Sequence, residues 1–464
     1  MTDSSNCYYR FPNVLEDRID YVYYHPRFER IINLKDEYKY PVHQLSEYIL
    51  NKWTGENLGK RDTKEKNYLY VKVENILDNK IVITGNSEFL SNSELNQLSN
   101  SVPKSNSILV TRVASFGRCA AVESDFKGAI SDNVLCFELD ERVEPYFISR
   151  FINSSLAQIQ LQRQAAGMGR GVLTYDRIGG LFIGVPTSKD EQNDILKFTE
   201  LKEREVAKLN EEMLKLLGDA QTLFLGMLGI SVTRELDRIS YYSDYVDKLD
   251  RLDYDYNSPK YDLIDEIISH SRVNFVELDN VADFILDSKD PTKYPKSLFS
   301  YVDIGNVDIN WGRLNPITMI GKDAESSRMR RLMYADTILV SITRPTRNAI
   351  AIVPKELDGQ ICSTGFAVLK CKGNMNNRFL FHALRTRLVN WEFQKNCSGS
   401  GYPAINQEID LPKIKVPKPL INEQLDIARE TEKLLVLAEI KEQEARQKQI
   451  EVTTYFDNLL LRSS

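Results

Sequence analysis

The sequence predicts an α+β fold in which two tandem α/β domains are separated and followed by long helices that form an antiparallel coiled coil. Two stretches of roughly 40 residues, 188–229 and 420–461, have the periodicity of long helices. Short motifs recur in the same order 230 to 233 residues apart, about half of the 464-residue chain. Runs of β-branched and aromatic residues fill the segments before each helix. The chain is therefore predicted to be a tandem duplication of a β-rich globular part followed by a long helix.

The first long helix, 188–229, has both a start signal and a coiled-coil seam. Ser188 followed by Glu191 matches a capping box, and carboxylates suit the positive end of a helix dipole. At 1.5 Å per residue the helix would be about 60 Å long, so it needs a partner helix. Apolar residues alternate in steps of three and four along a predicted seam: Val206, Leu209, Met213, Leu216, Ala220 and Leu223.

The second long helix, 420–461, opens in the same way and is the predicted partner. Glu423 and Gln424 stand where the first helix has Glu191 and Gln192, and each pair follows a strand-like run that ends in Val-Pro. Its apolar seam is less regular, because lysines at positions 441 and 448 fall where apolar residues are expected. Pairing of the two helices is therefore a hypothesis at this stage.

The internal repeat rests on seven matches in one order. A single match of this kind is common by chance, but seven in register indicate duplication. The matches are Arg18-Ile-Asp-Tyr with Arg251-Leu-Asp-Tyr, Pro26-Arg-Phe28 with Pro259-Lys-Tyr261, Tyr70 with Tyr301, Ile108-Leu-Val110 with Ile338-Leu-Val340, Gly128-Ala-Ile130 with Gly359-Gln-Ile361, Phe147 with Phe379, and Leu156 with Leu388.

Each half is predicted to be mostly antiparallel β structure with a short helix, a glycine-rich loop and a last strand before the long helix. Helix-like pieces are predicted at 18–34, 42–50, 144–162 and 377–390. The predicted boundaries are 1–187 for the first domain, 188–250 for the central helical spacer, 251–419 for the second domain and 420–464 for the distal helix.

Composition excludes several classes of protein. The sequence has no apolar run of 18 residues or more, and residues 1–18 lack a signal-peptide core, so a cytoplasmic protein without a membrane segment is expected. Six cysteines are scattered without close pairs, which suits a reducing compartment. Four histidines lie apart from the cysteines, so no metal site is predicted.

The net charge of −6 belongs to the long helices. Residues 188–229 and 420–464 each contain nine acidic and six basic residues, and these two contributions of −3 account for the whole net charge. The globular parts are therefore neutral together. Overall acidity argues neither for nor against nucleic-acid binding.

No catalytic constellation is found. The glycine-rich loop 167–171 lacks the Lys-Ser/Thr of a phosphate-binding loop, and two interpretations stay open: a flexible turn, or a loop whose backbone contacts DNA. The counterpart loop is 398–401. An Asn/Asp-Pro-Pro-aromatic motif of adenine methylation is absent, and no Ser-His-Asp set can be proposed. We therefore predict a chain without catalytic residues and without a bound cofactor of its own.

Basic clusters remain as the candidate functional residues. Residues 311–347 contain seven basic and three acidic residues, and arginine is the preferred residue for phosphates and guanine edges. Any single arginine could equally be a solvated surface charge, but clusters repeated in two domains favour DNA contact. The predicted DNA-binding residues are Arg112, Arg118, Lys127, Arg163, Arg170, Tyr175, Arg177, Arg328, Arg330, Arg331, Arg344, Arg347 and Tyr402.

Taken together, these motifs resemble the specificity (S) subunit of type I restriction–modification systems. The repeated Arg-Ile/Leu-Asp-Tyr motif, the strand ending in Val-Pro, the Glu-Gln helix openings and the half-chain duplication carry the resemblance, which extends over essentially the whole chain. The motifs are short, and their order makes the match specific.

The resemblance implies two target-recognition domains, each reading one half of a bipartite, asymmetric site in double-stranded DNA. The long helices would set the gap and dock two adenine methyltransferase (modification) subunits, which bind S-adenosylmethionine. A restriction subunit that uses ATP and Mg could join them. Rival hypotheses are a protein-binding scaffold, a stand-alone nuclease or methyltransferase, and a DNA-reading or scaffold subunit of another phage-defence complex.

Overall fold

The computed structural model describes residues 28–58, 67–77, 79–84, 87–113, 117–165, 172–232, 256, 258–324, 327–399 and 402–462. The chain divides into two compact units. One comprises the described residues up to Leu209 and from Gln443 onward, and the other comprises those from Asn210 to Glu442. Each unit therefore contains the first part of one long helix and the last part of the other. The domain boundaries predicted from the sequence stay a prediction, and the motifs at Arg18 and Arg251 lie outside the described residues.

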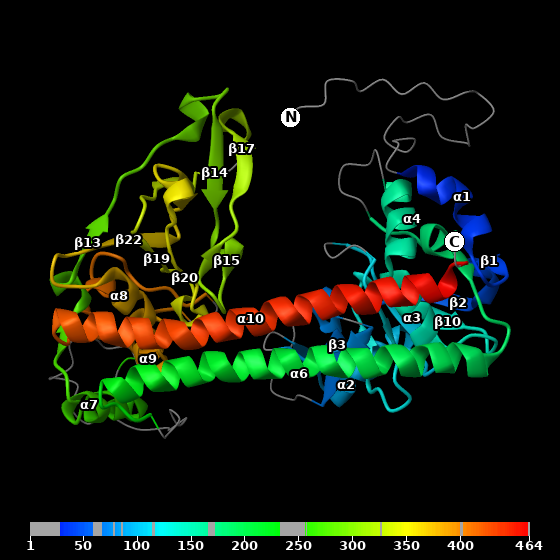
Figure 1. The fold of residues 1–464 in the computed structure, drawn as a ribbon, viewed down its shortest axis with the longest axis horizontal. Helices are drawn as coiled ribbons and strands as arrows, with labels where there is room; N and C mark the ends of the chain where they lie inside the picture. The colour runs from blue at the N-terminus through cyan, green and yellow to red at the C-terminus, as the bar shows by residue number, and fades with distance from the viewer. Residues whose placement is uncertain are drawn as a thin grey trace. The chain divides into compact units, whose positions relative to one another are not determined.

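Among its described residues, the first unit combines short strands with five short α-helices and the start of a long one (Figure 1). Its elements are α1 (Glu29–Glu37), β1 (Val42–Gln44), β2 (Ile49–Thr54), β3 (Tyr68–Val71), β4 (Ile76–Leu77), β5 (Lys80–Ile81), β6 (Glu88–Leu90), α2 (Asn92–Gln97), β7 (Ser107–Thr111), β8 (Cys119–Ala121), β9 (Gly128–Ile130), β10 (Val134–Leu139), α3 (Pro145–Asn153), α4 (Ser155–Ala165), α5 (Tyr175–Gly179), β11 (Phe182–Gly184) and the start of α6 (Lys189–Met227).

The second unit repeats this order with some changes. Its elements are α7 (Asp262–Ser269), β12 (Phe275–Glu277), β13 (Ala282–Ile285), β14 (Leu298–Val302), β15 (Val307–Asp308), β16 (Arg313–Leu314), β17 (Ile317–Ile320), β18 (Met329–Leu332), β19 (Ile338–Ser341), β20 (Ile350–Ile352), β21 (Ile361–Ser363), β22 (Phe366–Cys371), α8 (Asn377–Leu384), α9 (Arg387–Asn396), β23 (Lys415–Pro417) and the start of α10 (Ile421–Leu460).

A four-stranded antiparallel sheet is the central layer of each unit. The strand order is β2-β10-β7-β8 in the first unit and β13-β22-β19-β20 in the second. Alternate residues of one strand face opposite sides, as in any strand. Ile108 and Val110 of β7 pack with helices α3 and α4, whereas Leu109 packs toward the smaller sheet. The mixed helix-and-sheet fold predicted from the sequence is confirmed.

The smaller sheet corrects one predicted match. Its order is β6-β3-β9 in the first unit and β17-β14-β21-β18 in the second, and β18 has no counterpart among the described strands of the first unit. Tyr70 lies beside Ala129 in the first sheet, and Tyr301 lies beside Ile361 in the second. Ile361 therefore corresponds to Ala129 and not to Ile130, so the predicted alignment there was off by one residue.

Two helix predictions also differ from the structure. Segment 42–50 is not a helix: Val42–Gln44 and Ile49–Thr54 are strands that pair with β11 and β10. Segment 144–162 forms two helices, because Ser154 adopts an extended conformation between α3 and α4. Thr386 breaks the corresponding helix of the second unit, where its hydroxyl caps α9 by accepting from the Val389 amide.

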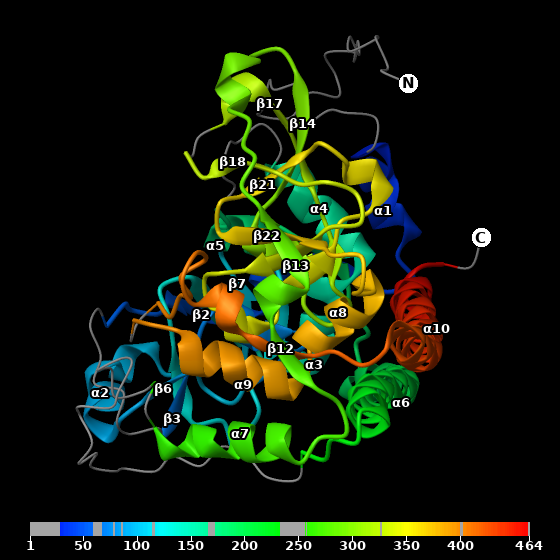
Figure 2. The same cartoon turned by 90° about the vertical axis from the view of Figure 1, so that its left-hand side faces the viewer.

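The two long helices are confirmed and lie side by side (Figure 1 and Figure 2), and their contacts show that they run antiparallel. In the first unit the Phe198 ring stacks on Tyr455 at 4.6 Å, and Glu205 pairs with Lys448. In the second unit Glu212 pairs with Lys441 at 3.4 Å. From each of these three contacts to the next, the position moves seven residues forward along α6 and seven residues back along α10. The lysines that interrupt the apolar seam of α10 thus belong to cross-helix ion pairs beside that seam.

A buried glutamine fixes the start of each long helix. The Gln192 amide donates to the carbonyls of Pro186 and Arg142, both at 3.0 Å, and its oxygen accepts from the Glu144 amide. Gln424, 232 positions later, makes three corresponding contacts, with Pro419, Asn374 and Asn376. Both side chains are fully buried. This geometry accounts for the repeated Glu-Gln motif, because a buried amide satisfies three backbone groups at once.

A second repeated position differs in charge between the units. Gln160 of α4 donates to the Phe182 carbonyl and accepts from the Phe182 amide. The equivalent residue in α9 is Glu392, whose carboxylate accepts from the Lys415 amide at 3.4 Å. Burial raises the pKa of the Glu392 carboxyl, although the Lys415 amide opposes this change. One carboxylate oxygen of Glu392 is buried without a partner among the described residues.

None of the described helices combines the length and the apolar character that crossing a membrane requires.

Substitution of Gln192 by leucine should destabilise the chain by about 2–5 kcal/mol, because two carbonyls and one amide would stay buried without partners. Gln424→Leu should have a similar effect. Urea unfolding followed by circular dichroism measures the change. Gln447→Leu on the exposed side of α10 is the matched control and should stay within about 0.5 kcal/mol. Equal midpoints for Gln192→Leu and Gln447→Leu would contradict the anchoring role.

Substitution of Glu392 by glutamine should stabilise the chain at pH 7 by about 0.5–1.5 kcal/mol, the contribution of one added hydrogen bond of the Gln160 type. The pKa of Glu392 is raised in the folded state, so the wild type loses stability as pH rises through and above the ordinary glutamate pKa of about 4.3. Unfolding measured at pH 4 and pH 8 should therefore show a larger gain at pH 8. A gain that is equal or larger at pH 4 would refute this assignment.

Candidate nucleic-acid interface

The second unit presents a stacked arginine and tyrosine at the end of its central sheet. The Arg344 guanidinium lies 4.6 Å from the centre of the Tyr402 ring, and Tyr402 is 75% exposed. The Arg344 amide donates to the Pro403 carbonyl at 2.7 Å, and its backbone is left-handed, with φ of 50°. The segment after β19 therefore holds a flat, cationic and aromatic surface of the kind that packs on bases or sugars.

Both units share one backbone hydrogen bond at this end of the central sheet, which we call the backbone frame, but they carry different side chains around it. The Leu173 amide donates to the Arg112 carbonyl at 3.0 Å, and the Ile405 amide donates to the Ile342 carbonyl at 2.9 Å. Thus the segment after the central strand is tied to the glycine-rich loop region in both units. Two repeats of one frame carry different residues at the same end of the sheet.

Tyr175 and Arg177 lie on α5, close to Arg112. The Tyr175 ring meets Phe137 edge-on at 5.7 Å, and burial raises the pKa of its hydroxyl while Arg112 lowers it. The Arg177 guanidinium donates to the Val172 carbonyl at 3.0 Å. Sequence reasoning missed Lys52, whose ammonium lies 5.4 Å from the Tyr175 ring centre. Alternation along the 49–54 strand would have indicated it, had that segment been recognised as a strand.

The arginines 328, 330 and 331 lie at β18, the strand added to the smaller sheet of the second unit. Arg331 donates to the Ile285 carbonyl at 3.3 Å, and Arg328 is exposed. The Nε atom of Arg330 is buried without a hydrogen-bond partner among the described residues. The Lys289 amide donates to the Arg330 carbonyl, so Lys289 also lies at this surface. This further cation was not predicted from the sequence.

The remaining predicted residues are dispersed. Arg347 and Lys127 are exposed, whereas Arg163 is only 8% exposed within α4 and is the least accessible arginine of the predicted set. Arg118 lines a pocket against α3, α6 and α10. Arg170 lies outside the described residues, as does the whole glycine-rich loop 167–171. The DNA-binding roles of all of these residues stay predictions.

Metal or thiol chemistry has little basis in the described part of the chain. Its described residues contain no group of three or more His, Cys, Asp or Glu side chains that could hold a metal ion. Burial raises the pKa of Cys119, Cys136, Cys362 and Cys371 to about 12, so these thiols stay protonated at neutral pH. What the structure does offer is one basic, partly aromatic surface in each unit.

Comparison with known proteins finds similar solved structures but no matching family model or curated protein. Its fold is similar to solved structures from type I restriction–modification systems. The crystal structure of the HsdS subunit from Thermoanaerobacter tengcongensis is 32% identical, with a TM-score of 0.33, over 39% of this chain and 46% of that chain. The match thus spans less than half of that HsdS subunit.

Two further similar structures cover most of both chains. A chain from a structure of complex assembly and conformational transition of the type I R-M system is 15% identical, with a TM-score of 0.44, over 91% of this chain and 99% of that chain. The S subunit from M. genitalium is 14% identical, with a TM-score of 0.37, over 92% and 97%. These similar structures belong to the family that the sequence resembles.

Arg347→Ala should weaken binding to random-sequence duplex DNA and reduce the slope of log affinity against log salt by about 0.9, the value for one lost phosphate contact. Fluorescence anisotropy at several salt concentrations measures both quantities. Arg429→Ala is the control, because Arg429 is an exposed arginine of α10 that pairs with Asp426. If Arg347→Ala and Arg429→Ala have the same salt slope, Arg347 does not contact a phosphate.

Proposed function

We propose that this chain is the DNA sequence-specificity subunit of a type I restriction–modification complex. One observation carries the proposal: the same backbone frame occurs twice, with Arg112 and Tyr175 at one copy and Arg344 and Tyr402 at the other. A protein that reads two different half-sites needs a constant frame with variable side chains. The target is therefore bipartite and asymmetric, with one half read by each domain.

The long helices set the gap between the two half-sites. Each helix is anchored at its start by a buried glutamine, and the antiparallel pair keeps one register in both units. A rigid helix pair holds two readers at a constant separation far better than a flexible linker does. Half-sites about one turn of DNA apart, roughly 34–36 Å, are the expected spacing for such paired readers.

The chemistry belongs to partner subunits. Two adenine methyltransferase subunits dock on the helix pair and use S-adenosylmethionine, and a restriction subunit that uses ATP and Mg joins them in a complete system. The globular parts of this chain are neutral overall, so partner subunits supply part of the electrostatic attraction to DNA. The complex works in the cytoplasm.

The test is expression of the chain with the methyltransferase subunits of its own system in a host without adenine methylation. Long-read sequencing of the host DNA should show one split adenine motif with a constant non-specific gap, and the motif should vanish when this chain is left out. A methyltransferase that binds the chain yet methylates without it would overturn the proposal. Loss of DNA binding by the whole assembly would favour a scaffold.

Substitution of Tyr402 by alanine should relax the methylated motif in one half only, because Tyr402 belongs to the second domain. Loss of one stacking contact costs about 1–3 kcal/mol, so methylation at that half should lose roughly tenfold to hundredfold discrimination. The control is Tyr455→Ala, since this half-buried tyrosine lies on α10 and stacks on Phe198. Equal relaxation of both halves would contradict a separate reader in each domain.

A further inference from the structure

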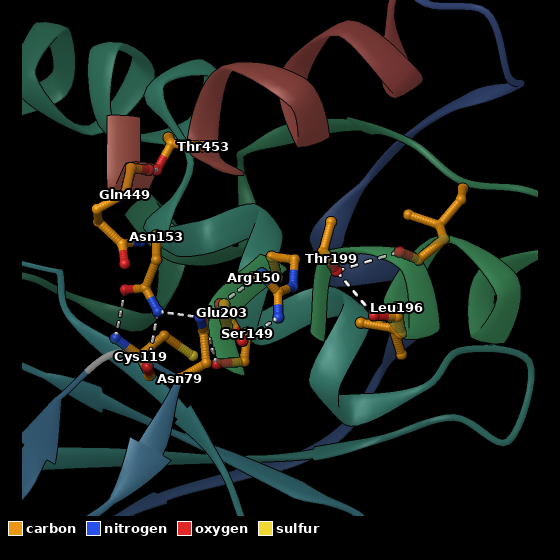
Figure 3. A network of polar contacts seen from close by, with 11 residues as sticks. Asn79, Cys119, Ser149, Arg150, Asn153, Leu196, Thr199, Glu203, Gln449 and Thr453 are labelled. Carbon is orange, nitrogen blue, oxygen red and sulfur yellow. Dashed lines mark hydrogen bonds and ion pairs between the residues drawn. The ribbon is translucent and has the colours of Figure 1, made fainter. Parts of the chain in front are cut away.

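The first unit contains a pocket of about 620 Å³ beside its two long helices. The turn between β4 and β5, the helices α3 and α4, and parts of α6 and α10 surround it. Figure 3 shows that Asn153 from α3 and Gln449 from α10 face this pocket, next to the Arg150–Glu203 pair. Val452 and Phe456 of α10 form its apolar side.

The pocket is rich in hydrogen-bond donors. Arg150 is 8% exposed and holds Glu203 through two contacts of 2.6 and 2.9 Å, but its Nε atom is buried without a partner in the described part of the chain. Arg118 reaches the pocket from the other side, and no partner of its guanidinium is found among the described residues. Two arginines and one glutamate leave the pocket with one net positive charge.

The equivalent place in the second unit is almost filled. The corresponding pocket measures about 60 Å³. Nine lining positions of the two pockets correspond at an offset of 232, among them the pairs Phe456 and Phe224, Arg150 and His382, and Asn153 and Arg385.

A longer hairpin fills the second pocket. Four residues connect β15 to β16, whereas two connect β4 to β5. The tip packs closely on α8: Gly312 has φ of 67°, and a Cβ there would lie 2.3 Å from the Arg385 guanidinium. Arg385 donates to the carbonyls of Ile309 and Asn310 at 2.8 and 2.6 Å, and Trp311 donates to Glu442 of α10. In this repeat, two carbonyl oxygens of a protein segment accept hydrogen bonds from Arg385.

We infer that the open pocket of the first unit receives an acidic side chain of the methyltransferase subunit, an inference that rests on the proposed function. The incoming carboxylate accepts hydrogen bonds from the Arg118 guanidinium and from Nε of Arg150. It thereby takes the place that hairpin carbonyls take beside Arg385 in the other repeat. One carboxylate neutralises the single net positive charge of the pocket.

A protein partner fits this place better than DNA does. The two long helices that border the pocket, α6 and α10, carry net charges of −3 and −4, so a phosphate backbone would meet repulsion there. Glu203 is also part of the lining. A single carboxylate clamped between two arginines avoids most of this repulsion, because its neighbours on a protein surface can be neutral.

The test measures the affinity of the full chain for its methyltransferase subunit in the absence of DNA. Arg118→Glu should weaken the complex at least about tenfold, because it places a carboxylate opposite the incoming one. Thr453→Trp should also weaken it, since an indole from α10 fills the pocket without changing its charge. The control is Lys80→Glu, an exposed lysine next to Asn79 that does not line the pocket, and it should leave the affinity unchanged.

The outcomes separate the inference from the proposed function. If the wild-type chain does not bind the methyltransferase, the proposed function fails. If both pocket variants bind like the wild type and stay folded by circular dichroism, the inference fails and the proposed function stands. If Arg118→Glu lowers only DNA affinity, Arg118 contacts DNA and the inference is overturned. A charge reversal of one methyltransferase carboxylate that restores binding to Arg118→Glu would confirm the pocket and identify its occupant.

Discussion

The buried amides of Gln192 and Gln424 are the contacts on which the arrangement of each unit depends. Each one joins the first turn of a long helix to the loop before α3 or α8 and to a proline between the preceding strand and the helix. Without them the helix could leave its domain at many angles, because a Val-Pro segment alone limits only its own backbone. A helix that leaves at a set angle can then meet its partner in one register. The first turn of each long helix is therefore held against its own domain.

The contrast between the two units shows which parts of the duplicated fold can change. Core contacts recur closely: Phe147 packs on Phe456, and Phe379 packs on Phe224, each pair shifted by the same 232 positions. The hairpin between the two sheets, the extra strand β18 and the residues after the central strand differ. Close packing resists change inside a core, whereas loops at the surface accept it. This division suits the proposed function, which requires a constant fold with variable surface residues.

Sequence reasoning predicted the duplication, the long helices and their pairing, because each leaves a periodic signal over many residues. It failed at 42–50, where short strands separated by one turn carry no clear period, and at Ile361, where a one-residue offset leaves the apolar pattern nearly unchanged. Among the candidate residues, composition could mark arginines but not their surroundings. The burial of Arg163 and the position of Arg118 in a pocket follow from tertiary packing, which a linear sequence does not display.

The register of the helix pair has a consequence for how such a protein can evolve. Contacts at 198 with 455, 205 with 448 and 212 with 441 repeat every seven residues on both helices. An insertion in one helix alone would shift every later contact out of phase. Equal insertions of seven residues in both helices would restore all of them and lengthen the pair by about 10 Å. Under the proposed function, the gap between the two half-sites would therefore change in discrete steps, whereas the surfaces that contact the bases could change one residue at a time.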